Sequence, residues 1–457
     1  MTHADRSRLP DIGPDPAFTF PRIVRHCLDN GLQIRTVEHH TMPVVSMVVQ
    51  VDAGAVADPL GREGLAAISA DMLDEGTGDL SAIDVSDAFA RIGAEYDVEV
   101  GPDVTSFTVT TLAKYAERGV SLLADILLRP GLRETDFDRV RQLRLDRLRQ
   151  LKDSPPAVAE RAFLRLMYGD HPYGHLPIGN AAALTALTLE DVASFHQQRF
   201  HPTRATAVVA GPLPHDGLLR LVERAFSDWA ETAGPPQGHP AGDVEAVSAP
   251  TRLAVVAREA APQSELRIGH LSAHRNSPDY PALLVMNAVL GGQFVSRINL
   301  KLREEKGYTY GARTGFDWRR GLAPFSLQAS VHTAATADAI ADCFAELDAI
   351  RGTRPPTGEE MALAKASLTR GYPRGFETAH QVARAVGQLA VYGLPDTYFE
   401  EFVPRVSAIQ AQDVVQVAER YIDPARTVTL VVGDYQAVGP TLGPLGLGEP
   451  QVLPADA

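Results

Sequence analysis

Histidines are the side chains of this 457-residue chain that could most directly bind a metal ion. Two histidines four residues apart share one face of a helix, and a glutamate between them can activate a metal-bound water. His171 and His175 have this spacing, but Pro172, Gly174 and Pro177 place them in a loop. The sequence therefore predicts no helical zinc site at this pair.

The other histidine groups offer no better metal site. His39 and His40 are neighbours, so in a strand they would point to opposite faces. His196 and His201 flank the break before Pro202 and lack the spacing of helical ligands. We expect no metal site built from the histidines of this chain.

The segment from Gly64 to Gly78 is predicted to form a helix. Leu65, Ile68 and Met72 recur at helical spacing and form an apolar stripe, and Gly76 suits the end of the helix. By itself this segment could be an ordinary amphipathic helix.

A second pattern lies in the other half of the chain, where Leu-Gly-Gly-Gln-Phe-Val-Ser-Arg (290–297) precedes Leu-Arg-Glu-Glu-Lys-Gly-Tyr-Thr-Tyr (302–310). Together with residues 64–78, it resembles the pitrilysin/insulinase family of inverted-zinc metallopeptidases. In that family the first motif runs roughly G-L-A-H-F-L-E-H-M-L-F-K-G-T. The second runs L-G-G-x-x-S-R-L, followed by L-R-E-x-x-G-x-x-Y.

The resemblance implies that the zinc ligands are missing here. The two histidine places of the H-x-x-E-H motif hold Ala67 and Asp71, and the place of the catalytic glutamate holds Ala70. The third ligand place, on a later helix, matches Arg147, and a cation there would repel zinc. Asp146 is adjacent but lies on a different, solvated helix face. Methyl groups cannot bind a metal, and one carboxylate is too few for zinc.

The resemblance also implies that Arg303 and Tyr310 reach a peptide held at a zinc site. A guanidinium can donate to a peptide carbonyl, and a phenol can donate to the oxyanion of the tetrahedral intermediate. The alternative is a surface arginine paired with Glu304 or Glu305, and a tyrosine packed at a strand end.

Gly291 and Gly292 have two interpretations. They can let a helix end in a sharp turn, or they can let the backbone approach a bound peptide. We expect them to belong to the substrate-binding set with Arg303 and Tyr310. No Lys-Ser or Lys-Thr follows them, so a phosphate loop is not supported.

The charge, hydropathy and cysteine content of the chain exclude several kinds of partner and location. The net charge is -14 and the pI about 5.5, which argues against nucleic acid or an anionic membrane as partner. The chain has no run of apolar residues long enough for a transmembrane helix, and its first residues lack the apolar region of a secretory signal. Cys27 and Cys343 read as free thiols. We expect a cytoplasmic protein.

The chain contains an internal repeat. Asp191-Val192, Pro202, Arg204 and the strand ending at Gly211 recur with a constant offset of 222 residues, for example at Asp413 and Gly433. A period this long indicates duplicated domains.

The repeat and a Pro/Gly-rich junction predict domains at 1–231 and 251–457, joined by a linker at 232–250. Each half mixes strands with helices without strict alternation, which favours an α+β class. Strands are expected at 32–37, 44–51, 253–256 and 264–270, and helices at 115–128, 134–151, 337–350 and 358–369. The resemblance implies two homologous lobes, each a mainly antiparallel sheet with helices, forming half of a clam-shell chamber. We also expect the two halves to fold independently.

The resulting hypothesis is the non-zinc-binding subunit of a heterodimeric zinc metallopeptidase, related to mitochondrial processing peptidase and inactive alone. It would bind peptides with Arg303 and Tyr310, hold no cofactor itself, and pair with a homologous subunit whose H-x-x-E-H motif binds zinc. Two alternatives are a structural scaffold subunit without a proteolytic role and a homodimeric peptide-binding module. Scaffolding does not require Arg303 and Tyr310, so their presence weighs against it.

Overall fold

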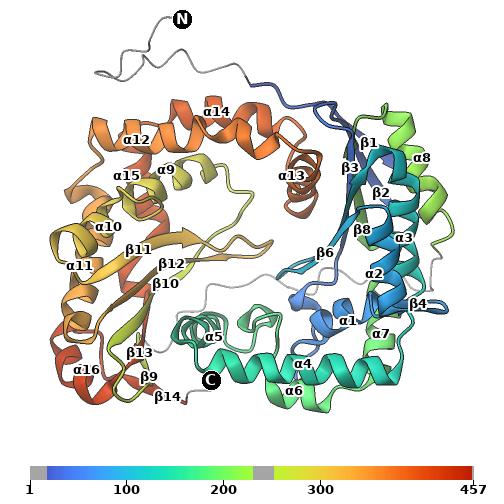
Figure 1. Cartoon of the computed structure of the whole chain (residues 1–457). Helices are drawn as coiled ribbons and strands as arrows, with labels where there is room; N and C mark the ends of the chain where they lie inside the picture. The colour runs from blue at the N-terminus through green and yellow to red at the C-terminus, as the bar shows by residue number, and fades with distance from the viewer. Residues whose placement is uncertain (1–17, 230–251, 455–457) are drawn as a thin grey trace, which may run out of the picture.

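The computed structural model describes residues 18–229 and 252–454. It has two lobes, each built on a six-stranded sheet, and the two sheets lie on opposite sides of the molecule (Figure 1). The predicted α+β class with two homologous lobes is confirmed. The proposed linker at 232–250 lies outside the described residues, and the domain boundaries remain a proposal.

The first sheet is formed by the N-terminal half. Its strand order is β1 (Ile23–Cys27), β2 (Gln33–Glu38), β8 (Ala205–Gly211), β3 (Val44–Val51), β7 (Thr105–Leu112) and β6 (Glu95–Val100). All neighbours pair antiparallel except β2 and β8, which are parallel. The β-branched run of β3 occupies the centre of the sheet, where such residues pack best.

The second sheet repeats this arrangement in the C-terminal half. Its order is β11 (Thr309–Phe316), β12 (Ala323–His332), β10 (Gln263–Ala273), β13 (Val428–Gly433), β9 (Leu253–Ala257) and β14 (Gln451–Leu453). Strand β9 is parallel to its neighbours β13 and β14, and the other pairs are antiparallel. Both sheets are therefore mainly antiparallel, as predicted.

Helices cover both sheets. Those of the first half are α1 (Leu65–Leu73), α2 (Ala82–Arg91), α3 (Ala116–Leu128), α4 (Glu134–Lys152), α5 (Pro155–Tyr168), α6 (Ala181–Ala186), α7 (Leu189–Arg199) and α8 (His215–Phe226). Those of the second half are α9 (Tyr280–Leu290), α10 (Arg297–Asn299), α11 (Thr336–Asp348), α12 (Gly358–Thr369), α13 (Ala379–Val391), α14 (Tyr398–Ala408), α15 (Ala411–Tyr421) and α16 (Tyr435–Leu442). The expected helix at 337–350 is found as α11, which continues beyond Asp348 as a π-helix over Ala349–Thr353, where Gly352 takes φ 147°.

The repeat found in the sequence is also a structural repeat. Helix α7 starts at Leu189 and α15 starts at Ala411, which is the same offset of 222 residues. In each copy a carboxylate at the third helical position completes a capping box, supplied by Asp191 and by Asp413. Each helix then leads through a short 3-10 turn at a proline into a buried strand.

The two halves exchange one helix each. Helix α5 of the first half packs on β13 and β10 of the second sheet, whereas α13 of the second half packs on β8 and β3 of the first (Figure 1). Gly387 allows the close approach of α13, because a Cβ at this position would lie 2.8 Å from the Gln50 amide nitrogen.

This exchange joins the cores of the halves. Val158 and Phe163 of α5 share one apolar cluster with Val256 and Leu430 of the second sheet. A second cluster contains Val48 and Val208 of the first sheet together with the apolar side chains of α13. The two halves therefore share their apolar packing, which argues against the expectation that they fold independently. An apolar helix face buries against whichever sheet is nearest, regardless of which half encodes it.

The turn between β11 and β12 adds a polar link between the lobes. The buried Arg319 guanidinium lies 5.0 Å from the ring centroids of both Tyr168 and Tyr173 and donates to the Tyr173 carbonyl at 3.0 Å. Its neighbour Arg320 forms an ion pair of 2.7 Å with Asp52. These contacts tie the turn of the second lobe to the first lobe.

Candidate functional site

Helix α1 occupies the position of the degenerate zinc motif and is almost wholly buried. Ala67 is 3% exposed and Ala70 is fully buried, so neither methyl group leaves space for a ligand. The Asp58 carboxylate holds the start of the helix by accepting from the backbone N–H groups of Gly64 and Ala66, at 2.7 and 2.6 Å. The contacts of Asp58 therefore have a structural role, because they cap the first turn of α1.

Asp71 does not point to an open metal site. Its carboxylate accepts a 2.7 Å hydrogen bond from Arg144 Nε, and this ion pair joins α1 to α4. Arg147, the predicted match to the third ligand, lies one turn further along α4 and is exposed. Both arginines line a pocket of about 470 Å³ with Asp71 and Asp74.

These residues do not fit a zinc ion. The donor set is one carboxylate already paired with a guanidinium, two buried methyl groups and an exposed arginine. Zinc requires three or four nitrogen, sulfur or oxygen ligands. Across residues 18–229 and 252–454, no group of three or more histidine, cysteine or acidic side chains is placed to hold a metal.

The carboxylate of Asp74 is electrostatically unusual. It lies at the end of α1 among other acidic groups, and burial, together with Glu75 and Asp71, raises the pKa of Asp74 to about 6. The neighbouring Tyr96 phenol has no hydrogen-bond partner within the described part of the chain, and burial raises its pKa as well. The surroundings of the Asp74 carboxyl therefore favour its neutral form.

The histidines have structural contacts. His175 Nε2 lies 3.0 Å from the buried Asp58 carboxylate, and His171 accepts from the Tyr173 backbone N–H at 3.1 Å. His196 donates to the Leu127 carbonyl at 2.8 Å, and burial lowers the pKa of its imidazole. Asp146, at 44% side-chain exposure, lies on the solvated face of α4 as predicted.

Arg303 follows α10 in a segment, Leu300–Glu305, wound as a π-helix. Its guanidinium lies over the ring of Phe294, 4.4 Å from the centroid. Its Nε is 3.4 Å from a Glu304 carboxylate oxygen, so the surface ion pair considered as an alternative does form. About a third of the side chain remains exposed, which leaves it accessible to a ligand.

Tyr310 projects from a β-bulge. Thr309 stands opposite Val331 and Ala312 opposite Ala329, so β11 contains one more residue than β12 between these pairs. A bulge re-aims the side chain of the extra residue. Tyr310 is 87% exposed and is not packed at the strand end.

Gly291 and Gly292 bring the end of α9 against the edge of β11. The backbone N–H of Thr314 donates to the Gly291 carbonyl at 3.0 Å, and a Cβ on Gly291 would lie 2.5 Å from the Thr314 hydroxyl. Asn299 Oδ1 accepts from the Ala312 N–H at 2.9 Å, also on the open edge of this strand. The close backbone approach is thus to a strand, while the peptide-binding role of the glycines stays a prediction.

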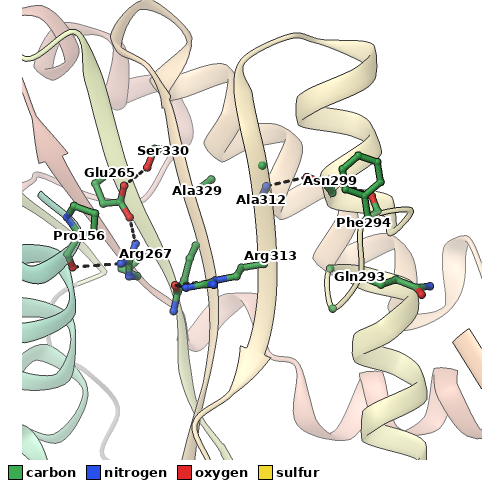
Figure 2. Close-up of a pocket in the computed structure, with 14 residues that line it drawn as sticks. Pro156, Glu265, Arg267, Gln293, Phe294, Asn299, Ala312, Arg313, Ala329 and Ser330 are labelled. Atoms are coloured by element: carbon green, nitrogen blue, oxygen red, sulfur yellow. Dashed lines mark hydrogen bonds and ion pairs between the residues drawn. The ribbon is translucent and has the colours of Figure 1, made fainter. Parts of the chain in front are cut away.

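A pocket of about 520 Å³, shown in Figure 2, is lined by neighbours of Arg303 and Tyr310 rather than by these two side chains themselves. It extends from Gly291, Gly292 and Phe294 across the faces of β11, β12 and β10 to the first turn of α5. Figure 2 shows Arg313 reaching across the sheet from β11, with Arg267 beyond it on β10. The pocket connects the predicted glycines with the neighbours of both predicted side chains, since Phe294 supports Arg303 and Gly311 follows Tyr310.

Three contributors were missed in the sequence. Arg144 shares a helix face with the buried Val140 and Leu148, and this spacing could have revealed that it faces α1. Phe294 lies at a variable position of the second motif, and Arg313 follows it on an edge strand. Nothing in the local sequence marks Phe294 or Arg313, because their roles depend on contacts with residues that are distant in the sequence or on a neighbouring strand.

Comparisons with known proteins identify the family. Residues 34–179 match the model for insulinase (peptidase family M16), and residues 186–368 match the model for the peptidase M16 inactive domain. The chain belongs to peptidase family M16. The M16 model for the first half covers α1 and its substituted motif.

Relatives of this M16 chain are similar along most of its length. An uncharacterised zinc protease of Mycobacterium tuberculosis is 26% identical over 412 residues, covering 89% of this chain and 92% of the relative. A probable mitochondrial-processing peptidase subunit beta of Schizosaccharomyces pombe is 24% identical over 281 residues, which is 59% of each chain.

Solved structures share the fold. The peptidase M16 inactive domain from Pseudomonas fluorescens superposes with a TM-score of 0.84 at 20% identity, covering 90% of this chain and 98% of the other. A protease from Helicobacter pylori gives a TM-score of 0.84 at 19% identity, covering 91% of this chain and 100% of the other. Within the described residues, none of the helices is long and apolar enough to span a bilayer.

Proposed function

We propose that this M16 chain is the non-zinc-binding subunit of a heterodimeric zinc metallopeptidase. It supplies Arg303 and Tyr310 to a peptide held at the zinc site of a homologous partner. The partner carries the intact H-x-x-E-H motif, and the substrates are peptides or unfolded segments small enough to enter the chamber between the subunits.

The observation that carries this proposal is the exposed phenol of Tyr310. A tyrosine at 87% exposure on a bulged edge strand contributes little to its own lobe. It is, however, presented to a ligand, as an oxyanion donor must be. Arg303, supported on Phe294, can donate to a peptide carbonyl before and during the reaction.

The requirement for a partner follows from the substituted motif. Ala67, Ala70, Asp71 and Arg147 offer no zinc ligand set and no glutamate to serve as base. A relative carries the printed name zinc protease, which is consistent with a zinc-binding homologue as the second subunit. We expect the isolated chain to hydrolyse no peptide.

Co-purification from the native source tests the proposal. We expect a complex of this chain with an M16 homologue that has the intact motif, with one zinc ion per pair and peptidase activity only in the pair. Self-association without such a homologue would favour the homodimeric peptide-binding module. A pair that assembles without hydrolysing peptides would favour the scaffold.

A further inference from the structure

We infer that Arg313 makes the pocket beside Arg303 and Tyr310 selective for acidic peptides, by binding the carboxylate of an Asp or Glu side chain. This inference rests on the proposed function, because it assumes that a peptide lies at these two residues. It adds a substrate class and a residue that determines specificity.

Arg313 belongs to a polar row across the sheet. Arg313 on β11 stands opposite Gln328 on β12, which stands opposite Arg267 on β10. Neighbouring strands are about 4.8 Å apart, so the two arginine backbones are separated by about 10 Å. Side chains directly opposite each other share one face, and the three residues therefore form part of the pocket wall together.

The acidic groups near this wall are paired with Arg267. Arg267 is buried, donates to Glu265, and lies 3.5 Å from a Glu160 carboxylate oxygen. Glu265 is fully engaged, since it also accepts from the Ser330 hydroxyl. The buried acidic group of the pocket is therefore neutralised by the buried arginine, and it is not available to Arg313.

Arg313 is held in place without being neutralised. Its Nε and Nη2 donate to the Gln328 amide oxygen at 3.3 and 3.0 Å. Among the residues that the structure describes, no carboxylate forms an ion pair with it. A neutral amide fixes the plane of the guanidinium, and the Nη1 side of the fork keeps its donors for a carboxylate.

The surroundings leave room for a peptide side chain. The next row of the sheet on this face contains Gly315, Ser326 and Gly269, which add almost no bulk beside Arg313. Phe294, at 61% exposure, forms an apolar wall at the other end of the pocket. The chain as a whole has a net charge of -14, so it has no general attraction for acidic peptides. The expected selectivity is therefore local to this pocket.

The test compares two labelled peptides of about eight residues that differ only in Glu or Gln at one position, which is moved along the peptide. Binding to the isolated full-length chain is measured by fluorescence anisotropy. At one position we expect the Glu peptide to bind about threefold to fivefold more tightly, because Arg313 is exposed and solvent weakens the pair. Added salt should reduce this ratio, because it screens the partly exposed pair.

Three variants test whether the difference in binding between the two peptides depends on Arg313. Arg313→Gln should abolish the difference between the peptides, and Arg313→Glu should reverse it in favour of a Lys peptide. Arg118→Gln, at an exposed arginine of α3, is the matched control and should keep the full ratio. An unchanged ratio in Arg313→Gln, no preference in the unmodified chain, or no binding of either peptide would overturn the inference. The proposed function is tested separately, by the activity of Tyr310→Phe in the reconstituted pair.

Discussion

Asp71, at a predicted zinc-ligand place, forms a structural contact with Arg144. The carboxylate at the second histidine place pairs with a guanidinium from α4, so a salt bridge now joins the two helices. The resemblance found in the sequence predicted the loss of zinc ligands at Ala67 and Asp71 and of the catalytic glutamate at Ala70. It could not identify the new contact, because the choice between Arg144 and Arg147 depends on how α4 is rotated against α1.

The ion pair between Asp71 and Arg144 should contribute modestly to stability. Arg144 is mostly buried and Asp71 is 43% exposed, so solvent screens the pair. We expect a coupling energy of about 0.5–1 kcal/mol in a double-mutant cycle of Asp71→Asn and Arg144→Gln, measured by urea unfolding. Strictly additive effects of the two substitutions would show that the coupling energy is zero and that the ion pair does not stabilise the fold.

Asp74 should make the protein less stable at neutral than at mildly acidic pH. The pKa of Asp74 is raised to about 6 in the folded chain, whereas the ordinary pKa of an aspartate is 3.8. The folded state therefore holds this proton more tightly than the unfolded state, and the free energy of unfolding falls as pH rises from about 4 to 6. Asp74→Asn should raise the free energy of unfolding at pH 7.5 by about 1–2 kcal/mol and change it little at pH 4. Equal effects of Asp74→Asn at both pH values would indicate that the pKa of Asp74 is not raised in the folded state.

The sequence largely predicted which segments form helices and strands. It did not predict which sheet each helix packs against. Local apolar periodicity predicted β3 and α12 with the observed bounds, and the offset of 222 residues predicted the second copy of the α7 to β8 unit. The same pattern could not show that α5 and α13 cross to the opposite sheet. Apolar residues at helical spacing specify that a face is buried, without specifying which sheet covers it.

The exchange of α5 and α13 predicts that neither half is stable alone. Removing residues 18–229 takes α5 off the second sheet and exposes apolar side chains of β13 and β10, and the converse holds for α13. We expect fragments 18–229 and 252–454 to be aggregated or to lack cooperative thermal unfolding when expressed separately. Co-expression should give a soluble complex. A cooperatively folded, monomeric single fragment, seen by circular dichroism and gel filtration, would contradict this account.

At the scale of the molecule, the structure brings the two parts of the second motif to one pocket. Gly291 lines it, Phe294 positions Arg303, and the bulge at Tyr310 lies at its edge. The motif in the sequence pointed to Gly291, Arg303 and Tyr310. Phe294 and the polar wall formed by Gln328 and Arg313 had no local signal, because they depend on tertiary neighbours and strand register. Together with the lost zinc motif, this arrangement favours a chain that completes the active site of another subunit.

The most direct test of that claim is steady-state cleavage of a fluorogenic peptide by the reconstituted pair containing Tyr310→Phe, with Arg303→Ala alongside. Loss of one oxyanion donor should lower kcat about 10²–10³-fold. Arg303→Ala should impair both substrate binding and turnover, since its contacts exist before and during the reaction. Tyr310 is exposed and Arg303 is partly exposed, so gel filtration should show unchanged assembly. Full activity in both assembled variants would contradict a catalytic contribution in trans and would favour the scaffold.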